Sequence, residues 1–312
     1  MTEKHASVDT RSENQYHLGM VRKVAALAAV VVLGGAGCGP ATKRGVGPPV
    51  VVATSTQTAD FVRIIGGDAV RVYSVVKPGV DPHEYEPTPA DLTTIRTAAV
   101  VVTNGVGLEP WFAKVKAASP PTGVVVVASD GVLLRPGDPH IWHDPANAKI
   151  MVTSIASALG KALPDQSATF TANLTAYLAQ LDQLNADITA QVASLTNRKL
   201  VTNHDAFGYL VDRYGFEFVG SVIPSFDTAT ELSTADVQVL VKKIRALGVK
   251  AIFSESSLPP KTAQAIATEA GVKVITGDDA LYGDSLGPAG SDGDTYLKMM
   301  RHNVRTIVTA LA

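Results

Sequence analysis

Four side chains able to bind a metal ion follow predicted strands in this chain of 312 residues. They are His83, His140, His204 and Asp284. The first two each end an Asp-Pro-His motif, and this recurrence is hard to ascribe to chance. Since open α/β sheets bind ligands at the carboxyl ends of their strands, we expect the four side chains to converge. Three neutral imidazoles and one carboxylate make a four-ligand shell for a divalent transition metal.

The composition narrows the kinds of site that the chain can build. The single cysteine, Cys38, excludes an internal disulfide framework, a four-cysteine zinc site and a redox cysteine pair. A net charge of -2, without a stripe of Lys and Arg, argues against nucleic-acid binding. Glu255, at the end of a predicted strand, and Glu231 are candidate acceptors for fixing the tautomer of a ligating imidazole, which metal-bound histidines generally require.

Short apolar runs alternate with helical stretches from residue 50 onward. The runs read VVVAT, VRVYSVV, AAVVVTN, GVVVVAS, RKLVTN, FEFVGSV, KAIFSE and VKVIT. Continuous apolar runs of this length, bounded by Gly and Pro, are typical of strands buried on both faces of a parallel sheet. The sequence therefore predicts an α/β fold.

One long helix is predicted over residues 165–196, which contain neither Gly nor Pro. Apolar residues recur there every three or four positions, at Phe170, Leu174, Leu178, Leu181, Leu184, Ile188, Val192 and Leu195. This period indicates an amphipathic helix of roughly 45 Å, with Asp165 or Ser167 as its N-cap. Because such a helix does not fit inside one small domain, we expect it to join two lobes.

The predicted architecture is two lobes, each a parallel sheet flanked by helices, joined by one long backbone helix. We expect the segments to be an N-terminal extension and signal peptide (1–37), a lipidated tether (38–49), an N-terminal lobe (50–163), the linking helix (164–197) and a C-terminal lobe (198–312).

Residues 20–40 have the order of an export signal: two positive charges, an apolar run of about 13 residues and small residues before Cys38. The run is too short for a bilayer, which needs about 20 residues. Cys38 resembles the lipid-bearing cysteine of bacterial lipoproteins, although Gly35 stands where an aliphatic residue is usual. An ordinary cleaved signal that leaves a free thiol is the alternative. The polar residues before Met20 suggest that Met20 is the true start.

A combination of motifs resembles one known family, the metal-binding lipoproteins of ABC importers for zinc and manganese, which have a rigid backbone helix. The motifs are DPHEYEP (81–87), NGVGLEPW (104–111), DPHIWHDP (138–145), HDAFGYLVDRYG (204–215), IFSESSLPPKTA (252–263), LYGDSLG (281–287) and TYLKMMRHNV (295–304). The resemblance covers the whole mature chain. It implies that His83, His140, His204 and Asp284 are the metal ligands, whereas His143 stands where the family uses none.

The resemblance also implies a function. We expect the protein to capture one divalent ion between its lobes and deliver it to an ABC permease, as an exported monomer held by the lipid on Cys38 at the outer face of a bacterial cytoplasmic membrane. Zinc is favoured because imidazole suits zinc, and His204 stands where manganese carriers of the family have a carboxylate. Manganese is the alternative cargo, since the His-rich loop of many zinc carriers is absent between Trp111 and His140. Cell adhesion is an alternative function, because some family members were first described as adhesins.

Three further residues have competing interpretations. His143 follows His140 by three positions, but Asp144 and Pro145 favour an extended loop that keeps it from the ion. His302 lies in a predicted C-terminal helix and is interpreted as a histidine of the helix face. Asp205 is a candidate N-cap where a strand turns into a helix.

Two enzyme interpretations compete with metal transport. GDSLG at 283–287 matches the Gly-x-Ser-x-Gly elbow, which would make Ser285 a nucleophile. An elbow needs a strand directly before it and a helix directly after it, and Pro288 and the distance from the preceding strand argue against both. A zinc hydrolase is the stronger alternative, because a zinc ion with three protein ligands activates water. A fourth ligand, Asp284, would instead close the coordination shell.

Overall fold

The computed structural model describes residues 47–230 and 233–312. The expectations for the signal peptide, for Met20 and Cys38 and for Glu231 lie outside the described residues. Within these two ranges, no helix is long and apolar enough to cross a membrane.

The first sheet has four parallel strands in the order β2-β1-β3-β4. These are β1 Val50–Ala53, β2 Arg71–Ser74, β3 Val100–Thr103 and β4 Val124–Val127, with helices α1 Thr56–Gly66, α2 Pro89–Thr97, α3 Pro110–Ala118 and α4 Pro145–Ala162. Alternate residues of its central strands pack on opposite faces. Val51 and Val100 belong to the core shared with α1 and α4, whereas Val52 and Val101 pack against α2 and α3. This double burial explains why the strands read as continuous apolar runs.

The second sheet repeats the arrangement, in the order β6-β5-β7-β8, and all its pairs are parallel. Its elements are β5 Lys199–His204, β6 Glu217–Ile223, β7 Ala251–Phe253 and β8 Lys273–Ile275, with helices α6 Gly208–Tyr214, α7 Thr234–Leu247 and α8 Lys261–Ala270. Val201 and Ile252 pack against α7 and α8, while Leu200 and Phe253 join the same core as the first sheet. One hydrophobic core therefore runs through both lobes.

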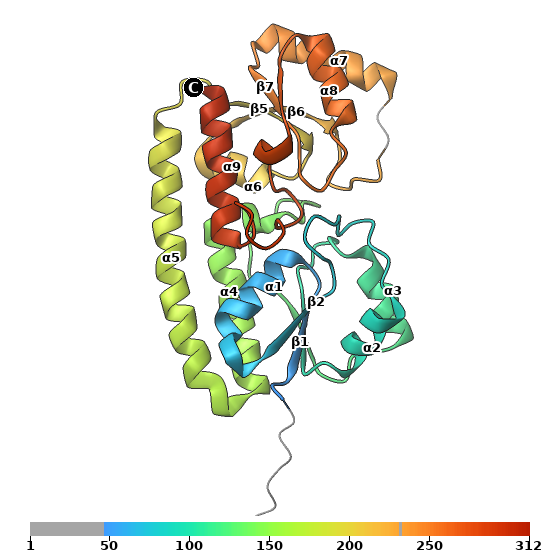
Figure 1. The fold of residues 1–312 in the computed structure, drawn as a ribbon, viewed down its shortest axis with the longest axis vertical. Coiled ribbons are helices and arrows are strands. Elements are labelled where there is room, and N and C mark those ends of the chain that lie inside the picture. Colours follow the sequence, from blue (N-terminus) through green and yellow to red (C-terminus); the bar gives the residue numbers. More distant parts are fainter. Residues whose placement is uncertain (1–46, 231–232) are drawn as a thin grey trace, which may run out of the picture. The chain divides into compact units, whose positions relative to one another are not determined.

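Helix α5, Ser167–Ala193, is the long helix, and its 27 residues span about 40 Å. It packs against α1, α4 and the C-terminal helix α9, Tyr296–Leu311 (Figure 1). The predicted N-cap is wrong: a short 3-10 turn, Pro164–Gln166, precedes the helix, and Gln166 takes the N-cap position without a side-chain bond. The two sheets, their helices and this long helix confirm the predicted fold class.

Candidate metal centre

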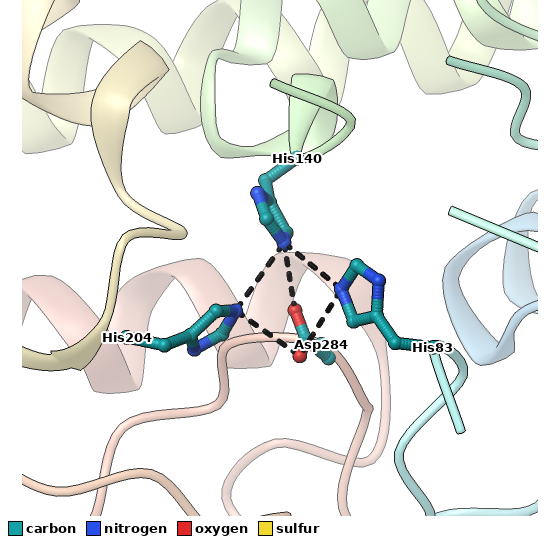
Figure 2. A group of neighbouring side chains, drawn as sticks. All are labelled: His83, His140, His204 and Asp284. Atoms are coloured by element: carbon teal, nitrogen blue, oxygen red, sulfur yellow. Dashed lines mark hydrogen bonds and ion pairs between the residues drawn. The ribbon is translucent and has the colours of Figure 1, made fainter. Parts of the chain in front are cut away.

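The structure brings His83, His140, His204 and Asp284 to one point (Figure 2). One ligand atom from each lies within 4.8 Å of all the others. The Nε2 atom of His140 is 3.3 Å from the Nε2 atoms of both other histidines. Asp284 reaches all three rings: its oxygens lie 3.2 Å from His140 Nε2, 3.2 Å from His204 Nε2 and 3.7 Å from His83 Nε2.

These separations have the size that a tetrahedral metal site requires. Zinc bonds to histidine nitrogen at about 2.0–2.1 Å, which sets the edges of a regular tetrahedron at about 3.3 Å. Five of the distances, measured to one or the other oxygen of Asp284, run from 3.2 to 3.7 Å, and one atom from each residue lies within 4.8 Å of all the others. Four such atoms can therefore coordinate a single ion once the longest separations shorten.

The Asp-Pro-His motif has a structural reason at both of its occurrences. Asp81 Oδ1 accepts the backbone N–H of His83 at 2.9 Å, and Asp138 Oδ1 accepts that of His140 at 3.0 Å. A carboxylate that bonds the backbone two residues later forms a local turn and fixes the direction of the histidine. Asp138 does more, because the same oxygen lies 2.8 Å from the ring Nδ1 of His140. The motif contains the residue, but nothing in the sequence indicates this second role.

His204 is the last residue of β5, and Glu255 stands just beyond the end of the neighbouring strand β7. Glu255 Oε1 lies 3.0 Å from the backbone nitrogen of His204 and 2.7 Å from its ring Nδ1. A carboxylate on Nδ1 leaves Nε2 unprotonated and available to a metal. Both residues are almost completely buried.

Asp284 lies on the loop between β8 and α9. The side-chain amide of Asn303 brackets this loop: its Oδ1 accepts the backbone N–H of Tyr282 at 2.9 Å, and its Nδ2 donates to the carbonyl of Tyr282 at 2.8 Å. The next residue, Gly283, passes so close to Glu255 that any Cβ there would overlap the carboxylate. A side chain at position 283 would therefore displace the Glu255 carboxylate from its place on His204.

Because the site is buried, the charge of each residue strongly affects the pKa values of its neighbours. His83 is 8% exposed, and the other three residues are at most 1% exposed. Burial alone would raise the pKa of Asp284, but His204 and His140 hold it well below its usual range. Burial lowers the pKa of His204, yet Asp284 and Glu255 together raise it well above the ordinary value. In His140, Asp138 and Asp284 likewise outweigh burial and raise the pKa, whereas burial prevails in His83 and lowers it.

Two remaining histidines lie outside this cluster. His143 is buried in a 3-10 turn, Ile141–His143, so the expected extended loop is wrong, and its ring packs 4.5 Å from that of Phe207. It is not one of the four converging residues. His302 lies on α9, where its Nε2 is 3.0 Å from the carbonyl of Ala280.

The surroundings of Asp205 argue against a helix cap, and those of Ser285 argue against a catalytic nucleophile. Asp205 is not a cap, because α6 begins later, with Phe207 as its N-cap. The Ser285 hydroxyl makes its hydrogen bonds with backbone groups, accepting the N–H of Gly79 at 2.9 Å and donating to the carbonyls of Leu286 and Lys77 at 3.2 and 3.5 Å. A nucleophile would instead be bonded to a base.

Comparison with known proteins agrees with the motifs. Residues 51–310 match the family described as zinc-uptake complex component A, periplasmic. The zinc-binding protein TroA of Treponema pallidum is 36% identical over 278 residues, covering 85% of this chain and 90% of TroA. The solved structure of TroA covers 85% of this chain and 100% of its own, with a TM-score of 0.80 and 35% identity.

Two further relatives are named for manganese and for iron. The manganese-binding lipoprotein MntA of Bacillus subtilis is 33% identical over 304 residues, covering 92% of this chain and 97% of MntA. The iron ABC transporter substrate-binding lipoprotein MtsA of Streptococcus pyogenes is 29% identical over 279 residues, covering 84% of this chain and 88% of MtsA. The family is described as a zinc-uptake component, and its relatives are named as metal-binding or substrate-binding proteins, so neither hydrolase interpretation applies. The resemblance seen in the motifs is confirmed, and the chain belongs to the family of periplasmic zinc-uptake component A proteins.

Proposed function

We propose that this protein is the extracytoplasmic receptor of an ABC importer, which binds one divalent transition metal ion through His83, His140, His204 and Asp284 and delivers it to a membrane permease. Zinc is the favoured cargo and manganese the next candidate. The observation that carries the proposal is the convergence of four buried ligand atoms at separations suited to one tetrahedral ion.

The burial of Asp284 and its lack of backbone or hydroxyl donors in the described part of the chain support a bound cation at this position. Its carboxylate is buried, and among the described residues neither of its oxygens accepts a hydrogen bond from a backbone or hydroxyl group. Burying an ionised carboxylate is costly unless it is paired or coordinates a metal. A divalent ion at the centre would supply that partner.

The choice of zinc is based on ligand chemistry. Three imidazole nitrogens and one carboxylate suit zinc, whereas manganese prefers a larger share of oxygen ligands. The relatives named for zinc, manganese and iron are similar enough to leave all three metals in contention. The Irving–Williams order makes zinc bind more tightly than manganese to almost any such site, so affinity alone does not identify the cargo.

Elemental analysis of the chain from Gly39 onward provides the test. The protein is stripped with a chelator, equilibrated with equal free zinc and manganese, and desalted. We expect one zinc per chain, and its loss in a variant that combines His140→Ala with Asp284→Ala. One manganese per chain would overturn the preference for zinc, and no retained metal would overturn the proposed function.

The location of the protein is a separate part of the proposal. We propose that Cys38 carries a lipid that holds a monomer at the outer face of the cytoplasmic membrane. The residue order around Cys38 supports this, and MntA and MtsA are named as lipoproteins. Mass spectrometry of the protein extracted from membranes should find lipid on Cys38, and Cys38→Ser should release the protein from the membrane fraction.

A further inference from the structure

Ser285 belongs to the LYGDSLG motif and has no role in metal binding itself. It is fully buried next to Asp284, and its hydroxyl accepts the backbone N–H of Gly79 at 2.9 Å. Gly79 lies in the loop after β2, in the first lobe, and has a φ of 76° that favours glycine. The bond therefore connects a loop that follows the second sheet to a loop of the first lobe.

Three more bonds tie the same loop to the first lobe. The backbone N–H of Leu286 donates to Thr56 Oγ1, at the start of α1, at 2.8 Å. The Gly79 N–H also lies 3.2 Å from the carbonyl of Leu286. On the other side of Asp284, Trp142 Nε1 donates to the carbonyl of Gly283 at 3.2 Å. Asp284 is thus held to the first lobe on both of its sides.

The backbone hydrogen bonds between this loop and the second sheet end at Leu281, although Gly283 still lies against Glu255. Leu281 pairs with the segment after β7: its N–H donates to Ser254 at 2.9 Å, and its carbonyl accepts from Ser256 at 2.8 Å. The chain then passes Tyr282 and enters its contacts with the first lobe. At the start of α9, the backbone N–H of Tyr296 donates to Asp60 of α1 at 2.9 Å.

We propose that Thr56 and Ser285 are positioning residues that fasten Asp284 to the first lobe. His83, His140 and Asp284 then form a half-site on one rigid body, and His204 is the single ligand carried by the other lobe. This inference depends on the proposed function, since it concerns the order in which ligands leave the ion. When the lobes part, His204 withdraws together with Glu255, and the other three ligands keep their arrangement.

This division differs from the arrangement expected from the sequence, which assigned Asp284 to the C-terminal lobe with His204. A half-site of three fixed ligands captures an ion first, and one moving ligand completes the shell. Release is then the reverse, because withdrawal of His204 opens a coordination position to a competing group. The carboxylate that neutralises the ion stays with it until that exchange occurs.

The test removes the two hydroxyl groups and measures how fast the ion leaves. Thr56→Val keeps the shape of the side chain, and Ser285→Ala removes the other acceptor. Zinc is released from each loaded variant by excess chelator in a stopped-flow instrument. Because a neutral hydrogen bond corresponds to about a fivefold effect, we expect each variant to release zinc about five times faster and the double variant about twenty-five times faster.

Two matched variants separate positioning from a general loss of packing. Thr56→Ser keeps the hydroxyl and should restore most of the difference. Ser221→Ala removes a hydroxyl that bonds Ile223 at 2.7 Å within the second lobe, and it should leave the release rate unchanged. The spectrum of the cobalt-loaded protein is a further readout, because its visible bands should weaken in the double variant as four-coordinate geometry is lost, while Ser221→Ala leaves them unchanged.

Hydrogen exchange tests which lobe carries the loop. In the metal-free protein, the amides of Gly79 and Leu286 should stay as protected as they are with zinc bound. If Asp284 moved with the second lobe, both amides would lose protection on metal removal, and the inference would be wrong. Unchanged zinc release in all the variants would also refute it. A wild-type protein that binds no zinc would instead refute the proposed function, so the two failures are distinguishable.

Discussion

Replacing Glu255 by Gln tests whether a carboxylate behind His204 is needed for metal binding. Glu255 Oε1 lies 3.0 Å from the backbone nitrogen and 2.7 Å from the ring Nδ1 of His204. Gln keeps the shape and one acceptor oxygen but removes the negative charge from a buried site. Its amide N–H groups would also replace Oε2, which has no hydrogen-bond donor among the described residues.

The expected loss of zinc affinity follows from the effect of mutating such carboxylate partners in other metal sites. Mutating the partner behind a ligating histidine typically weakens metal binding by about 10- to 100-fold, or about 1.4–2.7 kcal/mol. We expect Glu255→Gln to fall in this range. Asp138→Asn should behave similarly, because Asp138 holds Nδ1 of His140 at 2.8 Å.

Competition with a chromophoric chelator at constant neutral pH measures the zinc affinity of each variant. The control is Asp236→Asn, which changes a carboxylate of the α7 capping box without touching the site. Thermal unfolding of the metal-free proteins shows whether each variant is folded. If folded Glu255→Gln and Asp138→Asn bind zinc within about threefold of the wild type, these carboxylates do not support the ligands and the reasoning fails.

Three further predictions concern the ligands, the pH dependence of stability and the long helix. His140→Ala should lose stoichiometric zinc in equilibrium dialysis, whereas His143→Ala should change the affinity by less than about tenfold, and the reverse ranking would contradict the ligand assignment. Burial lowers the pKa of His143 to about 3, so below pH 6.5 the unfolded chain takes up a proton that the folded chain refuses. His143 should therefore contribute a loss of stability of about 1.4 kcal/mol per pH unit as the pH drops below about 6.5, and His143→Phe should reduce the slope in urea unfolding by about this amount; an equal slope would exclude a contribution from His143. Leu184→Ala, in the buried face of α5, should lower the free energy of unfolding by about 2–5 kcal/mol in the same assay, and a loss below about 0.5 kcal/mol would mean that this face is not tightly packed.

The sequence was sufficient for the fold because burial leaves a strong local pattern. The eight apolar runs correspond to β1 through β8, and the apolar period of 165–196 corresponds to α5. Helix ends were harder to predict, since Asp165 and Ser167 both have the residue types that cap helices, yet a 3-10 turn places Gln166 at the cap. The prediction that Asp205 caps a helix is wrong for a similar reason, because α6 begins only at Gly208, with Phe207 as its N-cap. Such details depend on tertiary contacts that override local preference.

The converging residues could be predicted because each follows a strand, and parallel strands place their carboxyl ends at one edge. The carboxylates behind the histidines were harder to find. Asp81 and Asp138 occupy the same place in the same motif, and both accept a backbone N–H. Asp138 also bonds the ring of its histidine, whereas the second oxygen of Asp81 accepts the Thr228 hydroxyl at 2.6 Å. The orientation of a ring is a property of the folded site. Glu255 could be suggested because it ends a strand next to that of His204.

A count of charges predicts how the metal-free site compensates for its buried carboxylates. Asp138, Glu255 and Asp284 are at most 2% exposed, and of their three negative charges only that of Asp138 is paired, within the described residues, with a cationic side chain, Arg135 at 3.2 Å, which also bonds the exposed Asp212.

The remaining two charges match one divalent ion when the imidazoles are neutral. Without the ion, two protons can take its place, because nearby carboxylates overcome burial and raise the pKa values of His204 and His140. Binding near or below the ordinary imidazole pKa of about 6.5 should therefore release close to two protons per ion, and affinity should fall as the pH falls. Calorimetry in buffers of different ionisation enthalpy measures this number. Release of no protons would show that His140 and His204 are neutral before the ion arrives, and that the buried charge must be balanced in another way.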